Sequence, residues 1–403
     1  MRRSSSLLTR LAGVAAGVVL AAAAVLVAAL PAQAATLSQV TGFGSNPGNL
    51  AMYAYRPDGL PANAPAVVLL HGCTQNASTY FTNSGWQKYA DQWKFTVIVP
   101  QQPSANNANS CFNWFETGDT ARGQGEALSV KQMVDHARAN YGTDASRVYV
   151  SGLSGGGAMS AVMLATYPDV FAAGSVIAGI PYRCATSMVN AFSCMNPGVD
   201  KTPAQWGDLV RNAYAGYTGK RPRVAIWHGT SDTTVAPLNA AESRDQWTNV
   251  LGVSQTPTST AALPAGTSLE VYGSDQVRLY RVSGMGHGTP VDPGSATDQC
   301  GTAGAYFLDT ICSTYRDALF FGLNGGGGTP SPTPTATTSP TPTPTTAPVC
   351  VTASNYAHVT AGRAYQSGGY AYALGSNQRM GLYNTFYTST LKQTGPAYWV
   401  IGC

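Results

Sequence analysis

Short apolar runs alternate with longer amphipathic stretches between Ala35 and Leu323. Runs of this kind are typical of buried strands in a mostly parallel sheet whose two faces are covered by helices. The predicted strands are Ala66–Leu70, Phe95–Pro100, Arg147–Val150, Ala172–Ile177, Arg223–Trp227 and Val277–Val282. The predicted helices are Gln87–Trp93, Gly125–Tyr141, Gly157–Tyr167 and Asn239–Leu251. The alternation predicts an α/β fold whose chemistry lies in loops after the carboxyl ends of the strands.

Residues 1–34 have the pattern of an export signal. Three arginines precede an unbroken apolar run, Leu11–Leu30, and the segment ends in Ala-Gln-Ala, whose small alternate residues suit signal-peptidase cleavage. The alternative is an uncleaved membrane anchor, because the apolar run is long enough to span a bilayer. The Ala-x-Ala ending favours cleavage, so we expect a secreted, extracellular protein that starts near Ala35 and has no stable membrane association.

The C-terminal part of the chain divides into a linker and a small module. Residues 324–349 contain four consecutive glycines and then repeated Thr-Pro and Ser-Pro, a composition that forms semi-rigid spacers rather than a core. Residues 350–403 are rich in Gly and Tyr, and we expect a β-rich module. Residues 35–323 are left as the main domain.

Charge argues against nucleic-acid binding. The formal net charge is +4, and removal of the three arginines of the signal leaves 4 − 3 = +1. No basic run is present to neutralise phosphates. Charged residues make up 10% of the chain, against about 25% in ordinary domains. Such a surface suits an uncharged or insoluble substrate.

The chain has eight cysteines. An even number behind an export signal indicates disulfides. Locality and the domain boundaries favour Cys73–Cys111, Cys184–Cys194, Cys300–Cys312 and Cys350–Cys403. The alternative is a zinc site, but no Cys-x-x-Cys occurs and histidines are few, so we expect no metal.

Ser154 is the candidate nucleophile. Gly152-Leu153-Ser154-Gly155-Gly156 follows a predicted strand and precedes a predicted helix. In a G-x-S-x-G elbow, strained backbone pushes the serine hydroxyl clear of the sheet, and the glycines stand where a Cβ would clash. The alternative is a flexible Gly-rich loop, but the order of strand, elbow and helix favours the catalytic interpretation.

His287 and Asp232 are the candidate partners of Ser154. His287 lies between glycines after the strand Val277–Val282, and Asp232 follows the strand Arg223–Trp227. Taken separately, the histidine could make a structural hydrogen bond and the aspartate could simply form a turn. The order Ser154, Asp232, His287, each after its own strand, is that of α/β-hydrolases.

Ester cleavage also needs donors for the oxyanion of the tetrahedral intermediate. The residue after the nucleophile, Gly155, and an upstream loop at His71-Gly72-Cys73 would supply them, with Cys73 as the second donor. The remaining histidines are expected to brace their loops (His71 and His228) or to lie at the surface (His136 and His358).

Together these motifs resemble a known family, the secreted short-chain polyhydroxyalkanoate (poly(3-hydroxybutyrate)) depolymerases, with the related feruloyl and acetylxylan esterases. The resemblance covers residues 36–323 and lies in the segments 71–75, 111–115, 152–156, 228–232 and 286–290. It implies nucleophile Ser154, base His287, orienting Asp232, and oxyanion donors Cys73 and Gly155. It also implies that residues 350–403 are a substrate-binding module.

We therefore expect a secreted, monomeric serine esterase with an α/β-hydrolase domain, which hydrolyses a short-chain polyester through an acyl-enzyme and needs no cofactor. One alternative is a feruloyl or acetylxylan esterase that acts on plant cell-wall polysaccharide with a carbohydrate-binding tail. The alternative of another class is a non-catalytic surface-binding protein on a hydrolase scaffold, in which Ser154 would be inert.

Overall fold

The computed structural model describes residues 35–325, 350–395 and 398–403. The chain forms two compact units, which divide between residues 331 and 332. The predicted export signal, 1–34, and most of the predicted linker lie outside the described residues. No helix within the described ranges has both the length and the apolar character needed to cross a membrane.

The first unit is built on one large sheet. Its strands are β1 (Ser38–Val40), β2 (Ala51–Tyr55), β3 (Ala66–Leu70), β4 (Thr96–Gln101), β5 (Val148–Leu153), β6 (Ala173–Ile177), β7 (Arg223–Gly229), β8 (Ser259–Leu263), β9 (Thr267–Tyr272) and β10 (Val277–Val282). They are ordered β1-β2-β4-β3-β5-β6-β7-β10-β9-β8. The strands in the middle of this order, β4-β3-β5-β6-β7-β10, pair in parallel. Antiparallel strands close both edges, with β2 next to β4 and β9 next to β10.

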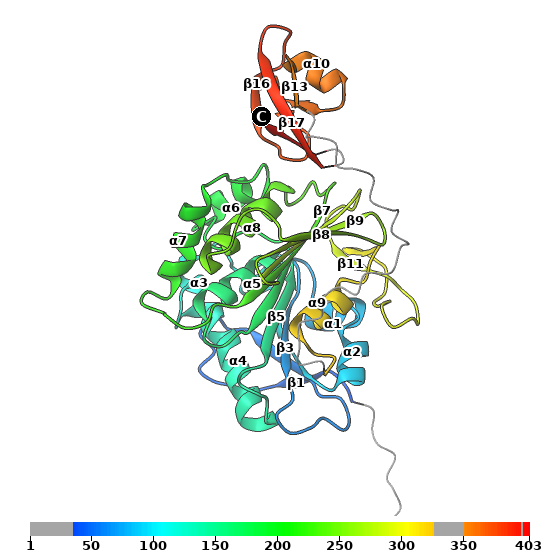
Figure 1. Cartoon of the computed structure of the whole chain (residues 1–403). Coiled ribbons are helices and arrows are strands. Elements are labelled where there is room, and N and C mark those ends of the chain that lie inside the picture. The colour runs from blue at the N-terminus through cyan, green and yellow to red at the C-terminus, as the bar shows by residue number, and fades with distance from the viewer. Residues whose placement is uncertain (1–34, 326–349, 396–397) are drawn as a thin grey trace, which may run out of the picture. The chain divides into compact units, whose positions relative to one another are not determined.

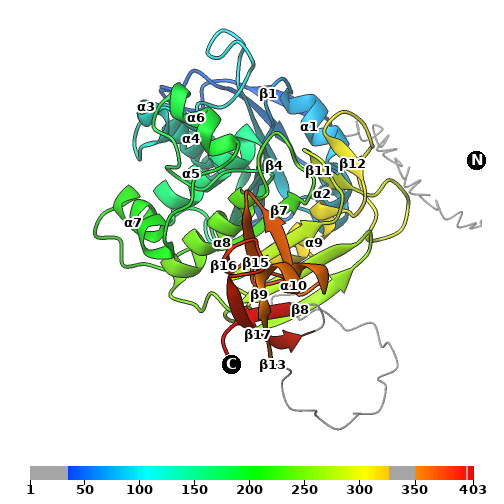
Figure 2. The ribbon, with the colours of Figure 1, turned by 90° about the horizontal axis from the view of Figure 1, so that it is seen from above.

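Helices cover both faces of this sheet. They are α1 (Ala77–Asn83), α2 (Trp86–Trp93), α3 (Thr117–Thr120), α4 (Gly125–Tyr141), α5 (Gly155–Thr166), α6 (Met188–Met195), α7 (Pro203–Ala213), α8 (Leu238–Leu251) and α9 (Ser313–Phe321). Figures 1 and 2 show α4, α5 and α8 on one face and α1, α2 and α9 on the other. The short strands β11 (Thr289–Val291) and β12 (Phe307–Asp309) form a separate parallel pair. The α/β-hydrolase architecture expected from the sequence is confirmed.

Each face of the sheet has its own hydrophobic core. On the α4, α5 and α8 side, Met133, Met159 and Trp247 are fully buried. On the other side, Trp86 stacks on Phe321 of α9, and Tyr80 packs against Phe307 of β12. Complete burial of such a side chain stabilises the fold by roughly 1.5–3 kcal/mol. The two cores make the sheet a rigid platform for the loops at its strand ends.

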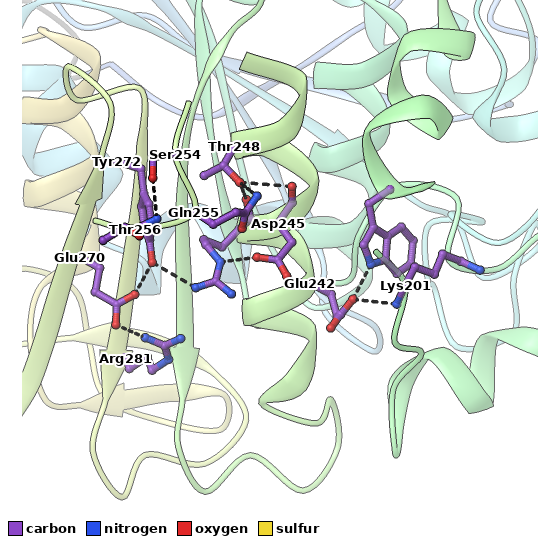
Figure 3. A network of polar contacts seen from close by, with 12 residues as sticks. Lys201, Glu242, Asp245, Thr248, Ser254, Gln255, Thr256, Glu270, Tyr272 and Arg281 are labelled. Carbon is purple, nitrogen blue, oxygen red and sulfur yellow. Dashed lines mark hydrogen bonds and ion pairs between the residues drawn. The ribbon is translucent and has the colours of Figure 1, made fainter. Parts of the chain in front are cut away.

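A polar network ties α8 to its neighbours (Figure 3). Glu242 of α8 accepts hydrogen bonds from the indole of Trp206 on α7 and, at 3.2 Å, from the backbone N–H of Lys201. Farther along the sheet edge, the Tyr272 hydroxyl donates to Glu270, which also pairs with Arg281 at 2.6 Å.

The second unit is a small β-rich module, as expected. Strands β13 (Cys350–Ser354), β17 (Thr388–Gly395) and β18 (Tyr398–Ile401) form one sheet, and β14 (Ala364–Ser367), β15 (Tyr370–Ala373) and β16 (Arg379–Leu382) form another, with one helix, α10 (Asn355–Thr360). Its core is small and includes Leu391 and Trp399. A disulfide joins Cys350 to Cys403, with Cα atoms 6.2 Å apart, and supplements the stability that so small a core gives.

The expectation that His358 lies at the surface is wrong. Its side chain is fully buried in the second unit. Its Nε2 donates to the carbonyl of Ser389 at 2.9 Å, and Arg363 donates to its Nδ1 at 3.0 Å. Two partners satisfy the ring, and so the module can hold this polar side chain in its interior. His136 is half-buried, with its ring edge-on to Tyr141.

Candidate active site

The predicted site residues lie at one edge of the sheet. Cys73 follows β3, Ser154 follows β5, Asp232 follows β7 and His287 follows β10. These strands are parallel, so their carboxyl ends point to the same edge of the sheet. The fold thus brings four loops that are far apart in sequence to one place.

Ser154 occupies the strained elbow that the sequence predicts. Its φ of 57° and ψ of −117° lie outside the usual regions for a non-glycine residue. Its N–H donates to the carbonyl of Ile177 at 2.9 Å, which holds the turn against β6. A Cβ at Gly152 would overlap the carbonyl of Gly156, and one at Gly156 would overlap that of Leu70. Glycine is therefore required at both positions, because β3, β5 and α5 approach so closely.

Asp232, which is buried, and His287 form a hydrogen-bonded pair. Asp232 Oδ2 accepts a hydrogen bond from His287 Nδ1 at 2.7 Å, while Oδ1 accepts from the backbone N–H groups of Thr234 and Val235 at 2.9 Å each. Burial by itself would raise the pKa of Asp232, but these donors and a contact with His228 hold the pKa well below its usual value. The carboxylate is ionised at neutral pH and fixes the proton of His287 on Nδ1, which leaves Nε2 free to accept another.

Hydrogen bonds link the loop that carries Asp232 to the loop that carries His287. The N–H of Ser231 donates to the carbonyl of Met285 at 3.0 Å, and that of Gly284 donates to the Thr230 hydroxyl at 2.8 Å. His228 is buried and braces the same turn, with Nε2 2.9 Å from the carbonyl of Val235. Side chains held by several such contacts keep one geometry, which acid–base catalysis requires.

One pocket, of about 140 Å³, brings the remaining groups together. Its lining includes Ser154, His287 and Cys73. Among the described residues, no acceptor binds the backbone N–H of Cys73 or of Gly155. An ideal Cβ at Gly155 would lie 3.1 Å from Cys73 Sγ, so the two residues are neighbours. Two unpaired amides beside a serine hydroxyl suit an oxygen that becomes negatively charged.

The upstream loop that contains Cys73 is held from several sides. A disulfide joins Cys73 to Cys111, with Cα atoms 4.2 Å apart. The N–H of Gly72 donates to the side chain of Gln75 at 2.8 Å. His71 Nε2 accepts from the N–H of Gln102 at 3.1 Å, so Nδ1 carries the proton and donates to Gly72. Burial lowers the pKa of His71 to about 4, and this histidine braces the loop as a neutral group.

Sequence reasoning missed three residues that line the pocket: Met195, Thr234 and Tyr306. Met195 ends α6, and Thr234 follows Asp232 in the same turn. Tyr306 has a positive φ of 63° and lies edge-on to the His287 ring at a centroid distance of 6.2 Å. Only proximity to Asp232 could have indicated Thr234, and no motif marks the other two.

In the part of the chain that the structure describes, no group of three or more His, Cys, Asp or Glu side chains could hold a metal ion. A serine on an elbow, beside a His–Asp pair and two unpaired amides, can attack a carbonyl and transfer an acyl group.

Comparisons with known proteins agree with this chemistry. Residues 49–271 match the family model described as Esterase PHB depolymerase. Poly(3-hydroxyalkanoate) depolymerase C of Paucimonas lemoignei is 56% identical over 308 residues, which cover 75% of this chain and 74% of that protein. Feruloyl esterase B of Thermothelomyces thermophilus is 41% identical over 267 residues, 64% of this chain and 90% of the relative.

A solved structure is similar in fold as well. The acetyl xylan esterase from Aspergillus awamori aligns with a TM-score of 0.62 and 32% identity, and covers 72% of this chain and 99% of that one. The family match spans more than half of the chain, and the sequence and structural relatives are esterases or depolymerases. The chain therefore belongs to the PHB-depolymerase family of esterases and is a carboxylic ester hydrolase.

Proposed function

We propose that this esterase is exported and hydrolyses poly(3-hydroxybutyrate) or a similar short-chain polyester. The observation that carries the chemistry is the 2.7 Å hydrogen bond between Asp232 and His287 beside a pocket that Ser154 also lines. The choice of polymer rests on the 56% identity to a poly(3-hydroxyalkanoate) depolymerase, against 41% to a feruloyl esterase.

In the proposed mechanism, Ser154 Oγ attacks the ester carbonyl while His287 Nε2 takes its proton. The carbonyl oxygen becomes an oxyanion, which the N–H groups of Cys73 and Gly155 stabilise. Collapse of the intermediate expels the alcohol end of the polymer, which receives the proton from His287. A water molecule, deprotonated by His287, then attacks the acyl-enzyme and releases the acid. Asp232 stays ionised throughout.

The second unit is proposed as the module that adsorbs the enzyme to its substrate. It exposes several aromatic side chains, with Phe386 89% accessible and Tyr387 51%. Tyr365 and Tyr372 stack with centroids 5.4 Å apart. Exposed aromatic groups of this kind give large contact areas on an uncharged solid.

The second candidate function is cleavage of acetyl or feruloyl esters on plant cell-wall polysaccharide. The similarity to the acetyl xylan esterase structure over nearly all of that chain favours it. Aromatic side chains also bind sugars, so the module fits either substrate. The pocket chemistry is the same for both, and the alternatives differ only in what carries the ester.

The test is clearing of a poly(3-hydroxybutyrate) suspension by the full chain, with a soluble short-chain aryl ester and acetylated xylan in parallel and Ser154→Ala as control. Clearing that requires Ser154 is the expected result. Aryl-ester and xylan cleavage without clearing would favour the cell-wall function. Absence of fluorophosphonate labelling at Ser154, with all substrates untouched, would point to a non-catalytic protein.

A further inference from the structure

The first unit exposes few large apolar side chains, and they gather around the pocket. Its described part has five of them: Met188, Val189, Phe192, Leu238 and Tyr306. Three belong to α6, whose last residue, Met195, lines the pocket. Tyr306 lines the pocket itself, and Leu238 lies against Gly198, just after α6. Exposed apolar residues without a function are normally scattered singly, so this grouping marks an interaction surface.

The geometry of α6 gives the surface a direction. Met188, Phe192 and Met195 are spaced by four and three residues, so they lie along one side of the helix. Val189 flanks this line and is 78% exposed, and Phe192 is 65% exposed. We name Met188, Val189 and Phe192 the α6 stripe. The stripe leads along the helix to Met195 and therefore to the pocket that contains Ser154.

The stripe is held in place rather than left loose. A disulfide joins Cys184 to Cys194 across the start and end of this segment. The side-chain amide of Asn239 donates to the carbonyl of Cys194 at 3.0 Å, and the N–H of Ala236 donates to that of Met195 at 2.8 Å. The helix end is thus attached to the loop that follows Asp232. A partner bound on the stripe would be fixed relative to the Asp232–His287 pair.

The chemistry of the segment indicates what binds there. Residues 184–199 contain no charged side chain. A charged or strongly hydrated partner would find no ion pair on this helix, whereas an uncharged apolar solid would lose only weakly bound water. We propose that the α6 stripe is a second polymer-contacting surface, which seats the solid polyester at the mouth of the pocket and presents its chain to Ser154. This inference rests on the proposed polyester function.

The test compares two full-chain double variants. Val189→Gln with Phe192→Gln removes the apolar surface but keeps residues that tolerate a helix, and Val189→Leu with Phe192→Leu is the matched apolar control. We expect the Gln pair to clear a poly(3-hydroxybutyrate) suspension at least about tenfold more slowly at limiting polymer, because two large apolar contacts are lost. The Leu pair should stay within about twofold of wild type.

Hydrolysis of a soluble aryl ester separates the stripe from the pocket. Both variants should keep wild-type kcat/KM on it, since neither changed residue lines the pocket. Equal clearing by wild type and the Gln pair would overturn the inference, and so would an equal fall on polymer and soluble ester. Failure of wild type to clear any polyester would instead overturn the proposed function. A wild-type dimer that the Gln pair converts to monomer, seen by sedimentation, would assign the stripe to a second copy of the chain and refute the inference.

Discussion

Replacing Asp232 by Asn tests how the carboxylate directs His287. In the structure, Asp232 Oδ1 accepts from two backbone N–H groups and Oδ2 accepts from His287 Nδ1. An asparagine must keep its oxygen toward the two N–H groups, so its NH₂ faces the imidazole. Neutral His287 then holds its proton on Nε2, because Nδ1 has to accept. Nε2 is the nitrogen that must take the proton of Ser154, and it is no longer free.

The expected loss of kcat follows from this change of tautomer. The same substitution in another Ser-His-Asp triad lowers kcat by about 10⁴. At 1.36 kcal/mol per tenfold, this corresponds to about 5.4 kcal/mol of lost transition-state stabilisation. Residual activity should remain, because the Cys73 and Gly155 amides are untouched. The side chain stays nearly the same size, so the protein should remain folded.

The assay is kcat on a soluble short-chain aryl ester, with circular dichroism to confirm folding. The matched control is Asp309→Asn, which makes the same chemical change at an exposed position outside the pocket. We expect the control to keep wild-type activity. A folded Asp232→Asn protein with less than a tenfold loss would refute the assignment of Asp232 as the group that orients His287.

Three further predictions concern stability. Gly156→Ala should prevent normal folding or lower the melting temperature sharply, since a Cβ there overlaps the Leu70 carbonyl, whereas Gly118→Ala, with open space around it, should not. Burial raises the pKa of Asp317 to about 7, so the folded state holds a proton there that the unfolded state has lost, and stability falls as pH rises from 4 to 7. The melting temperature of Asp317→Asn minus that of wild type should therefore rise between pH 4 and 8. A difference that stays constant with pH in calorimetry would contradict this. Replacing Cys73 and Cys111 by Ser opens a link across 38 residues and should cost about 4 kcal/mol in urea unfolding.

The central strands of the sheet could be predicted because they are short runs of mainly apolar residues. Strand Ala66–Leu70 is apolar and buried at every position, and the predicted bounds agree with the structure, as they do for Val277–Val282. The edge strands gave no such pattern. Ser259–Leu263 is mostly exposed and its apolar part is only Ala261–Leu263, and Ser38–Val40 is short and polar, so neither has an apolar run long enough to detect. Their pairing depends on long-range hydrogen bonds that local sequence does not record.

The site was predictable only where chemistry leaves a motif. The glycines around Ser154 are required by close backbone contacts, and their spacing is visible in the sequence. Tyr306, by contrast, enters the pocket from a loop between β11 and β12, and its neighbours form no recognisable pattern. A residue that acts through position alone has no sequence signal, because the same tyrosine elsewhere would look identical.

Helix α6 shows why hydrophobicity alone could not predict that the α6 stripe is exposed. Apolar residues dominate Met188–Met195, and such composition normally predicts a helix that packs its large side chains inward. The structure does the reverse, for the buried residues are the small Ala191 and Cys194, while Val189 and Phe192 face outward. Turning the large residues inward would bury more apolar surface, so the outward arrangement costs stability. A hydrophobic pattern that disagrees with the observed burial of side chains is expected at functional sites, where the needs of function and of stability differ. Here the disagreement occurs on the helix that ends at the pocket.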